Sequence, residues 1–391
     1  MSAQNVFFTL VAAASAASLV SIALSQILLG VALAWALLKG RPLTAPSSCW
    51  PLAVFFGWTL LSAALSSDPA ASVPQIKKFY VWLMFPLAYM AVRSLGQLQR
   101  LFLAISLAGV ASALWSLVQF ARKFNQARAL GQPFSQYYDA DRITGFMSHW
   151  MTFGGGMLLV FCILAATALF HSGPRKPRLL PAAGAIIVAL AIGLGFTRSI
   201  WLASAVAGCV LIWQRKPWIL AAVPLALAAL VVLAPEPLHT RIVSIWQPKA
   251  SDSNTHREAL RATGLAMIAS RPLLGFGPEQ VGRNVPAYMP QRYQPIPAHW
   301  WVGHLHNQFL HYAAERGMPA ALALLAFFVW LARDQFRWRH GGSTRAASLA
   351  CIAGILAGGL FEVNLGDSEV LALFLAITGA AEGVRGQGSA Q

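Results

Sequence analysis

Charged residues are scarce in this chain. Asp, Glu, Lys and Arg make up 11% of its 391 residues, whereas hydrophobic residues make up 57%. A soluble domain carries about a quarter charged residues, so the composition excludes an ordinary water-soluble protein of this length. Most of the chain lies in apolar runs of roughly 15 to 25 residues, the length of helix that crosses a hydrocarbon core. The composition therefore predicts an integral membrane protein.

Cysteines are also few, and no two of them lie close together in the sequence. The four are Cys49, Cys162, Cys209 and Cys351, each in an apolar context. This gives no support to a disulfide framework or a cysteine metal site, and we expect small buried side chains instead. The N-terminal segment MSAQNVFFTL has no basic stretch ahead of its apolar run, so we expect no cleaved signal peptide.

Twelve apolar runs predict about 12 transmembrane helices in an all-α, polytopic membrane protein. They lie near 5–20, 23–38, 51–66, 79–95, 99–120, 150–171, 180–196, 199–213, 217–234, 308–331, 345–363 and 369–384. We expect three parts: helices one to nine in 1–234, a large loop with short helices in 235–305, and the last three helices with a short tail in 306–391. Within the loop, apolar residues recur at helical spacing over 255–269.

Acidic residues are scarcer than basic ones. The chain has 13 acidic and 29 basic residues, which gives a net charge of +16. In a soluble protein this balance would suggest nucleic acid, but short cytoplasmic loops of membrane proteins collect Lys and Arg. If the N-terminus is cytoplasmic, the inside loops carry only Asp334 and Glu382 as acids. Their basic residues are Lys39, Arg41, Arg93, Arg100, Arg175, Lys176, Arg178, Arg215, Lys216, Arg333, Arg337, Arg339, Arg345 and Arg385. This predicts no nucleic-acid partner and places two long loops, 121–149 and 235–305, outside.

Arg198 is the only charged residue between Leu179 and Trp213, and it lies between two short predicted spans. One interpretation is an arginine at a hairpin tip that extends to the membrane interface. The other is a cation held at membrane depth to pair with an anion, because an intramembrane charge is costly without a partner. No acidic residue lies nearby in sequence, and a phosphate would fit the guanidinium fork.

Three histidines, His304, His306 and His311, crowd the start of the tenth predicted span. Metal ligands, structural interfacial residues and a general base are the alternatives. The nearby carboxylates give no recognised metal spacing such as H-E-x-x-H, so we expect no metal. They are Glu315, Asp367 and Glu369. A general base is favoured because the ordinary pKa of histidine lies near working pH.

Further basic residues lie on the predicted outer side. Arg257 and Arg261 are four residues apart and share one face of the short helix predicted in the long loop. Such residues could bind anionic lipid headgroups, form a solvated face, or bind a phosphorylated substrate. The others are Lys77, Lys78, Arg122, Lys123, Arg142 and Arg271.

One spaced pattern surrounds the histidines. His306 and Asn307 are followed by nine residues, then Gly317, two more residues and Ala320. Two other patterns precede it in the chain. These are Arg198 with Leu202 four positions later, and Arg257 ahead of PLLGFGP at 272–278.

In this order the patterns resemble those of the O-antigen ligase family, within the superfamily that includes O-antigen polymerases and pilin oligosaccharyltransferases. Ala320 departs from the family signature, in which Gly, Thr or Tyr is usual. The resemblance extends over essentially the whole chain, through the dozen spans and the large loop between the ninth and tenth.

The resemblance implies a GT-C-like membrane glycosyltransferase of the cell inner membrane with its active site facing the periplasm. It would transfer a glycan from an undecaprenyl diphosphate-linked O-antigen donor to a lipid A–core acceptor, in lipopolysaccharide biosynthesis, without metal or cofactor. His306 would be the general base, with Arg198 and Arg257 stabilising the leaving diphosphate and the anomeric carbon inverting. The expected substrate-binding residues are Arg198, Arg257, Arg261, Arg142, Lys77, Lys78, Asn307 and Asp367. The resemblance does not identify the group that orients His306, and Asp367 and Glu369 are the candidates by position.

Other functions stay open at this point. An O-antigen polymerase or a protein O-oligosaccharyltransferase would use the same residue types. A transporter or flippase for a lipid-linked glycan would favour polar residues in the centres of several spans. The predicted spans are nearly free of charge in their centres, which favours the transferase.

Overall fold

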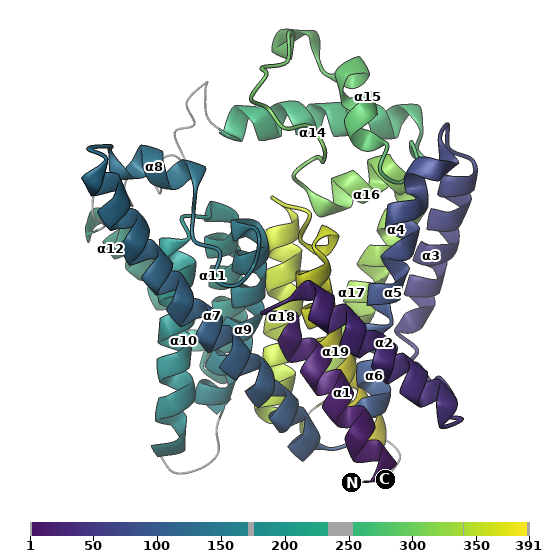
Figure 1. Cartoon of the computed structure of the whole chain (residues 1–391), viewed down its shortest axis with the longest axis vertical. Helices are drawn as coiled ribbons and strands as arrows, with labels where there is room; N and C mark the ends of the chain where they lie inside the picture. Colours follow the sequence, from purple (N-terminus) through teal and green to yellow (C-terminus); the bar gives the residue numbers. More distant parts are fainter. Residues whose placement is uncertain (1, 171–175, 234–252, 339, 389–391) are drawn as a thin grey trace.

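The computed structural model describes residues 2–170, 176–233, 253–338 and 340–388. Regular secondary structure in these ranges is entirely helical, which confirms the all-α prediction. Most helices stand side by side in one bundle, and α14 (Ser253–Ser270) and α15 (Val281–Tyr288) lie across one end of it (Figure 1). The start of α1 (Ala3–Ala17) and the end of α19 (Ser368–Gly388) lie at the other end (Figure 1).

Each of the twelve ranges predicted as a span contains helix, in some cases as two or three shorter pieces. The remaining α-helices are α2 (Ile22–Leu38), α3 (Cys49–Ala64), α4 (Val73–Lys77), α5 (Phe79–Trp82), α6 (Met84–Ala91), α7 (Leu95–Ala129), α8 (Phe134–Ala140), α9 (Trp150–Phe170), α10 (Lys176–Leu194), α11 (Arg198–Arg215), α12 (Val223–Leu233), α16 (Gln308–Arg316), α17 (Met318–Arg337) and α18 (Gly342–Gly359). Four short 3-10 turns complete the described elements: η1 (Pro69–Ser72), η2 (Pro217–Ala222), η3 (Gln291–Tyr293) and η4 (Asn364–Gly366).

Three of the described helices, α7, α9 and α17, are long and apolar enough to cross a membrane. Shorter apolar helices are α1, α2, α3 and the segment Arg178–Leu194 of α10. The chain is thus a helical membrane protein by these elements, while the number of twelve crossings stays a prediction.

Helix α9 lies inside the bundle, in contact with α7, α10, α11, α18 and α19. Its residues are apolar on all sides, as expected for a helix surrounded by protein. Small residues let its neighbours approach: a Cβ on Gly154 would come within 2.8 Å of Ile200 in α11. This close packing fixes the first turn of α11, which begins at Arg198.

The tenth predicted span, 308–331, is two helices rather than one. Gly317 separates α16 from α17 with a φ of +87°, and a Cβ there would lie 1.8 Å from the carbonyl oxygen of Leu273. Only glycine tolerates both conditions. The N–H of Met318 donates to the carbonyl of Pro272 at 2.8 Å, so the loop before α15 is attached at the break. The span therefore begins at Met318, and α16 lies at the α14 end, outside it (Figure 1).

Residues 253–305 form a small helical cap with an apolar core of its own. Helix α14 occupies the segment in which periodicity predicted a helix. Residues 234–252 of the predicted loop lie outside the described part of the chain. The buried side chains of the cap meet α16 through Ala314, and they include Ala259, Leu260, Met267, Phe276, Val281, Val285, Met289 and Leu305. The cap is thereby seated over one end of the bundle.

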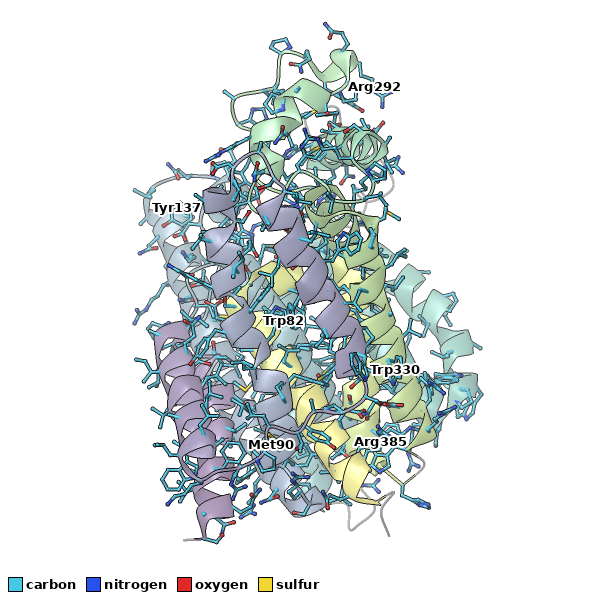
Figure 2. All side chains as sticks on the ribbon, turned by 90° about the vertical axis from the view of Figure 1, so that its right-hand side faces the viewer. Trp82, Met90, Tyr137, Arg292, Trp330 and Arg385 are labelled. Atoms are coloured by element: carbon cyan, nitrogen blue, oxygen red, sulfur yellow. The ribbon has the colours of Figure 1, made fainter. Side chains whose placement is uncertain are left out.

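The opposite end of the bundle gathers several loops that were predicted to lie inside. Gln4 in α1 donates to the carbonyl of Ala91 in α6 at 2.9 Å and accepts a hydrogen bond from Arg41 after α2. Arg385 also lies toward this end, far from Arg292 of the cap (Figure 2). These loops thus lie together at one end of the bundle, as expected if they are on the same side of the membrane.

Candidate active site

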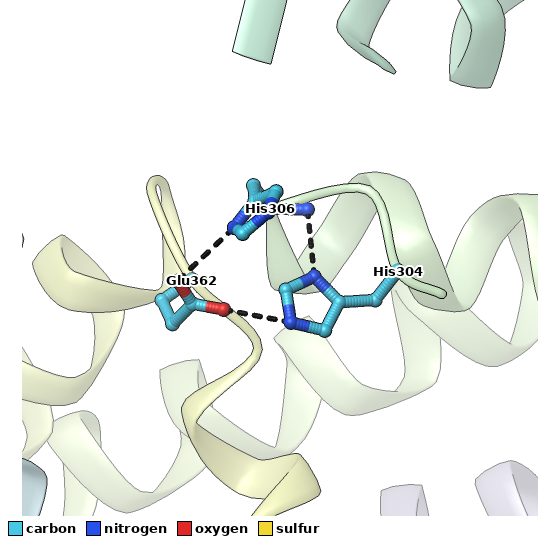
Figure 3. Close-up of side chains that lie close together, drawn as sticks. All are labelled: His304, His306 and Glu362. Carbon is cyan, nitrogen blue, oxygen red and sulfur yellow. Dashed lines mark hydrogen bonds and ion pairs between the residues drawn. The ribbon is translucent and has the colours of Figure 1, made fainter. Parts of the chain in front are cut away.

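Two histidines and one carboxylate meet beneath the cap. Glu362 follows the end of α18, and its two oxygens contact one histidine each (Figure 3). Oε1 lies 2.9 Å from Nε2 of His304, and Oε2 lies 3.1 Å from Nδ1 of His306. The backbone N–H of His306 also donates to Nδ1 of His304 at 3.2 Å. We refer to these three residues as the triad.

The hydrogen bonds of the triad assign the ring protons. Nδ1 of His304 accepts a backbone N–H, so its proton is on Nε2 and is donated to Glu362. His306 then donates from Nδ1 to Glu362, which leaves its Nε2 as a free acceptor. This is the tautomer that a general base requires.

The charges of the triad follow from its surroundings. Burial lowers the pKa of His306; Glu362 opposes this shift, and the charge of Arg257 adds to it. Although burial disfavours the carboxylate, hydrogen bonds from His304 and His306 hold the pKa of Glu362 well below its usual range. Burial thus favours the neutral imidazole of His306, next to a carboxylate that stays ionised. His306 can take up a proton there, and the imidazolium that forms lies next to a fixed negative charge.

The backbone at His306 is strained. Its φ is +47°, a left-handed value that costs a non-glycine residue about 1–2 kcal/mol. Among the described residues two other non-glycine positions have positive φ, Phe196 at 47° and Glu279 at 64°. Phe196 comes two residues before Arg198, and Glu279 lines a cavity next to the triad. Strain of this kind is retained where surrounding contacts fix a functional geometry.

Asn307 holds the start of α16 in place. Its Oδ1 accepts the N–H of Leu310 at 2.9 Å as the N-cap, and its Nδ2 donates to the carbonyl of Leu360 at 3.1 Å. The same side chain thus starts α16 and ties it to the end of α18, two residues before Glu362. Asparagine follows histidine in the sequence for a structural reason, because Asn307 fixes the position of the backbone at His306.

A cavity of about 410 Å³ lies beside His306, and we call it the arginine cavity. It brings together five of the residues predicted from sequence. Its lining consists of Arg198, Ser199, Leu202, Asn254, Arg257, Glu258, Arg261, Leu305, His306, Asn307, Leu360 and Phe361. Nη2 of Arg198 donates to Oδ1 of Asn254 at 3.1 Å, which connects α11 to α14 across the cavity.

Helix N-termini add positive potential to the arginine cavity. Arg198 and Ser199 are the first residues of α11, Arg257 lies near the start of α14, and α16 begins beside His306. Partial positive charge at these ends favours anions. Thr197 makes no side-chain cap for α11, and Oγ of Ser199 is buried without a hydrogen-bond partner. The cavity thus offers cations, amides and a hydroxyl to a bound anion.

A second cavity, of about 660 Å³, borders the same triad, and we call it the tryptophan cavity. His304 and Glu362 line it, whereas His306 lines the arginine cavity, so the triad contributes to the walls of both. Other lining residues include Lys78, His149, Glu279, Trp300, Trp301, His311, Glu315 and Asp367.

Comparison with known families identifies the segment that carries this geometry. Residues 182–325 match the family model described as O-antigen ligase. They contain Arg198, Arg257 and His306 in the order expected. Over this segment the chain is similar to the O-antigen ligase family. The match supports a glycosyl-transfer function of the ligase or polymerase kind. None of the curated proteins compared with the chain matches it significantly.

The predicted site residues fall into three groups. His306, Asn307, Arg198, Arg257 and Arg261 line the arginine cavity and lie within the ligase segment. Lys78 and Asp367 line the tryptophan cavity, where Nζ of Lys78 donates to the carbonyl of Gly366 at 3.0 Å and Asp367 accepts from Thr152 at 2.9 Å. The remaining two, Arg142 and Lys77, line neither cavity.

Arg142 and Lys77 have other surroundings. Arg142 donates to the carbonyl of Phe196 at 3.3 Å and to Asp139 at 3.0 Å, so it supports the turn ahead of Arg198. Lys77 is exposed at the last turn of α4. Neither arrangement gives the residue a direct role at a cavity.

The predicted partner of His306 is wrong. Neither Asp367 nor Glu369 contacts the ring in the described structure; Glu362 does. Glu362 lies outside the ligase segment and 56 positions from His306 in sequence, so no spacing rule connects them. A signal did exist, because Glu362 is a lone acid at the end of an apolar run, and an ionisable residue in such a place is a functional candidate.

Two further residues of the site carried no sequence signal. Ser199 contributes its buried hydroxyl to the arginine cavity. The ring of His256 in α14 lies 5.4 Å from that of His306, edge to face, and stacks on Trp300 at 4.8 Å. It thus packs the cap against the general-base candidate.

The triad also has the composition of a metal site. The ligand atoms of His304, His306 and Glu362 lie within 4.8 Å of one another. Two imidazoles and a carboxylate are a familiar ligand set for zinc, provided that the nitrogens facing the carboxylate give up their protons. Without a cation, the two N–H···O hydrogen bonds satisfy the same atoms. The absence of a metal requirement stays a prediction and is tested below.

Proposed function

We propose that this protein is an O-antigen ligase that transfers a glycan from undecaprenyl diphosphate to a sugar of the lipid A–core oligosaccharide. The observation that carries the proposal is the meeting of His306 with Arg198, Arg257 and Arg261 around one cavity. The family match over residues 182–325 supports glycosyl transfer in general. The reaction belongs to lipopolysaccharide biosynthesis.

The nucleophile is a hydroxyl of the acceptor sugar. Nε2 of His306 takes the hydroxyl proton as the oxygen attacks the anomeric carbon of the donor, and the bond from that carbon to the diphosphate oxygen breaks. The diphosphate leaves with the electron pair, and the proton on His306 passes to water afterwards. Because attack and departure occur on opposite faces of one carbon, the configuration inverts. Glu362 stabilises the imidazolium by its charge and by the hydrogen bond at Nδ1.

The leaving diphosphate gains negative charge as the bond breaks. The guanidinium groups of Arg198, Arg257 and Arg261 belong to residues that line the same cavity, so they can bind the transition state more strongly than the ground state. The hydroxyl of Ser199 and the first N–H groups of α11 can add hydrogen bonds to the same oxygens. No metal takes part in this scheme.

The donor carries a long lipid, and the arginine cavity has an apolar side that suits it. Leu202 and Leu360 line the cavity and are 44% and 53% exposed. These exposed leucines give the cavity an apolar edge, along which the polyprenyl chain can remain in the bilayer while its headgroup enters. We propose an inner-membrane protein with about twelve crossings and with the cap at the periplasmic face. The basic loops that gather with Arg41 and Arg385 at the opposite end support this orientation.

A transfer assay tests the proposal. Purified protein is incubated with undecaprenyl diphosphate-linked glycan and lipid A–core, and the products are separated by mass. We expect the glycan on the core. Glycan added to another donor glycan would instead indicate a polymerase. Unchanged donor that moves across a vesicle bilayer would indicate transport.

A further inference from the structure

We propose that the tryptophan cavity is the acceptor-sugar site, in which Trp301 and His311 recognise a neutral, hydroxyl-rich sugar. The inference rests on the proposed function and adds where the second substrate binds and by what chemistry. The argument comes from four properties of the cavity: its position, its charge, a buried nitrogen without a partner, and an exposed aromatic face.

The position suits a nucleophile delivered to His306. His304 and Glu362 line the tryptophan cavity, and the ring of His306 lies 4.3 Å from that of His304. The ring of Trp301 is 4.4 Å from His304 and 6.3 Å from His306. A sugar resting against Trp301 therefore has its hydroxyl groups within reach of the base.

The charge of the tryptophan cavity is opposite to that of the arginine cavity. Glu279, Glu315, Glu362 and Asp367 line it, against Lys78 and Arg283. Lys78 donates to the carbonyl of Gly366, Arg283 pairs with Asp68, and Glu315 pairs with Arg316, which leaves Glu279, Glu362 and Asp367 as the carboxylates without a paired Lys or Arg among these contacts. A diphosphate would be repelled by the carboxylates, whereas sugar hydroxyls donate readily to them. The arginine cavity thus suits an anionic substrate, and the tryptophan cavity suits a neutral one.

His311 lines this cavity, and one of its ring nitrogens has no hydrogen-bond partner. The residue is 8% exposed, and its buried Nδ1 has no hydrogen-bond partner. Its Nε2 lies 3.7 Å from Oε1 of Glu315, too far for a good hydrogen bond. Burial lowers the pKa of His311 to about 4, so the ring is neutral. A buried polar atom without a partner costs about 1–3 kcal/mol, and a sugar hydroxyl, which both donates and accepts, would satisfy it.

Trp301 provides the aromatic face. It is 59% exposed, a high value for the largest apolar side chain, while the neighbouring Trp300 is covered by His256. The negative face of an indole ring attracts the weakly positive C–H face of a sugar ring, and stacking of this kind is independent of net charge. The cavity thus has one aromatic face and several hydrogen-bonding groups. This lining is what recognition of a hydroxyl-rich sugar ring requires.

Binding measurements test the assignment without relying on turnover. The probe is delipidated core oligosaccharide, titrated into the purified full-length chain in detergent, and undecaprenyl diphosphate is titrated in parallel. The variants are Trp301→Ala, His311→Ala and His311→Gln, with Trp218→Ala as the matched control. Trp218 is 72% exposed and lies in η2, away from both cavities.

We expect the oligosaccharide to bind the unchanged chain and the control equally, and to bind Trp301→Ala and His311→Ala at least tenfold more weakly. His311→Gln should regain part of the loss, because its amide can still meet a hydroxyl. Binding of undecaprenyl diphosphate should be the same in all variants. Equal oligosaccharide binding by every variant, or none by the unchanged chain, would overturn the assignment.

Failure of the proposed function would look different. If the oligosaccharide binds as expected but no glycan is transferred to lipid A–core, the acceptor site stands and the ligase reaction does not. If transfer occurs and neither the Trp301 nor the His311 variants change the KM for the acceptor, the ligase reaction stands and the acceptor site does not. Because Trp301 is exposed, its removal should leave folding intact, which keeps the test valid if a His311 variant folds poorly.

Discussion

Glu362 and His306 are 56 positions apart in the chain, and the carboxylate Oε2 of the first lies 3.1 Å from Nδ1 of the second. The contact joins the end of α18 to the loop before α16, and it fixes both the tautomer and the orientation of the imidazole. A family pattern that ends before Glu362 cannot include this partner. The proposed functional unit is therefore larger than the segment that matches the family model.

Replacing His306 by alanine should abolish transfer. A positioned general base contributes about 10²–10⁴-fold, so we expect a loss of at least 100-fold in the transfer assay. His340→Ala is the matched control, because His340 is exposed and lies between α17 and α18, away from the triad. Insertion and expression of both variants should be normal. Full ligation by His306→Ala would remove the base from the mechanism.

Glu362→Gln should lower kcat more than it raises the KM for either substrate, because the amide keeps the shape but loses the charge beside the imidazolium. The pH–rate profile gives a sharper readout. Burial already lowers the pKa of His306, and Glu362 opposes that shift, so removing the carboxylate lowers the pKa further. Since the neutral ring is the active form, the acidic limb should lie at lower pH in the variant than in the unchanged chain. An acidic limb that moved upward would contradict the assigned roles.

Arg198→Ala and Arg257→Ala should impair use of the donor by about 10²-fold or more, as when a preorganised transition-state contact is removed. Arg198→Lys should not restore activity, because a lysine lacks the planar fork. Steady-state kinetics with varied donor measure this, and Arg128→Ala, an exposed arginine in the last turn of α7, serves as control. Normal turnover of Arg198→Lys would favour a simple interfacial arginine.

Transfer should persist in the presence of EDTA, because the hydrogen bonds of His304 and His306 already satisfy Glu362. The measurement is the transfer rate before and after dialysis against the chelator. Activity that was lost with EDTA and regained with zinc would instead establish the triad as a metal centre. His304→Ala distinguishes the metal centre from the metal-free triad further, since it removes a possible metal ligand but not the proposed base.

Gly317→Ala should destabilise the protein strongly. The new Cβ would lie 1.8 Å from the carbonyl of Leu273, in addition to the penalty for a positive φ. Gly131→Ala is the matched control: it has a φ of +65° but open space around it, so only the backbone penalty of about 1–2 kcal/mol applies. Thermal unfolding in detergent should show a large drop in Tm for the first variant and a small one for the second. Equal drops would mean that the loop moves aside without cost.

The helices and several site residues could be predicted because their signals are local. Apolar runs mark the helical segments, and a lone arginine in such a run, like Arg198, is conspicuous. Pairings through space leave no such mark. Glu362 is conspicuous as a lone acid, but nothing local connects it to His306, so Asp367 and Glu369 were the predicted partners instead. The break at Gly317 was also missed, because the close approach of Leu273 that requires it comes from a distant loop.

The triad forms part of two cavities of opposite charge, so the two substrates would occupy separate compartments at the same time. The glycan can then pass directly from the donor to the acceptor, without first becoming attached to the protein. Such a layout makes a covalent sugar–protein intermediate unnecessary, and it lets each pocket diverge in sequence to suit a new partner while the residues between them stay unchanged.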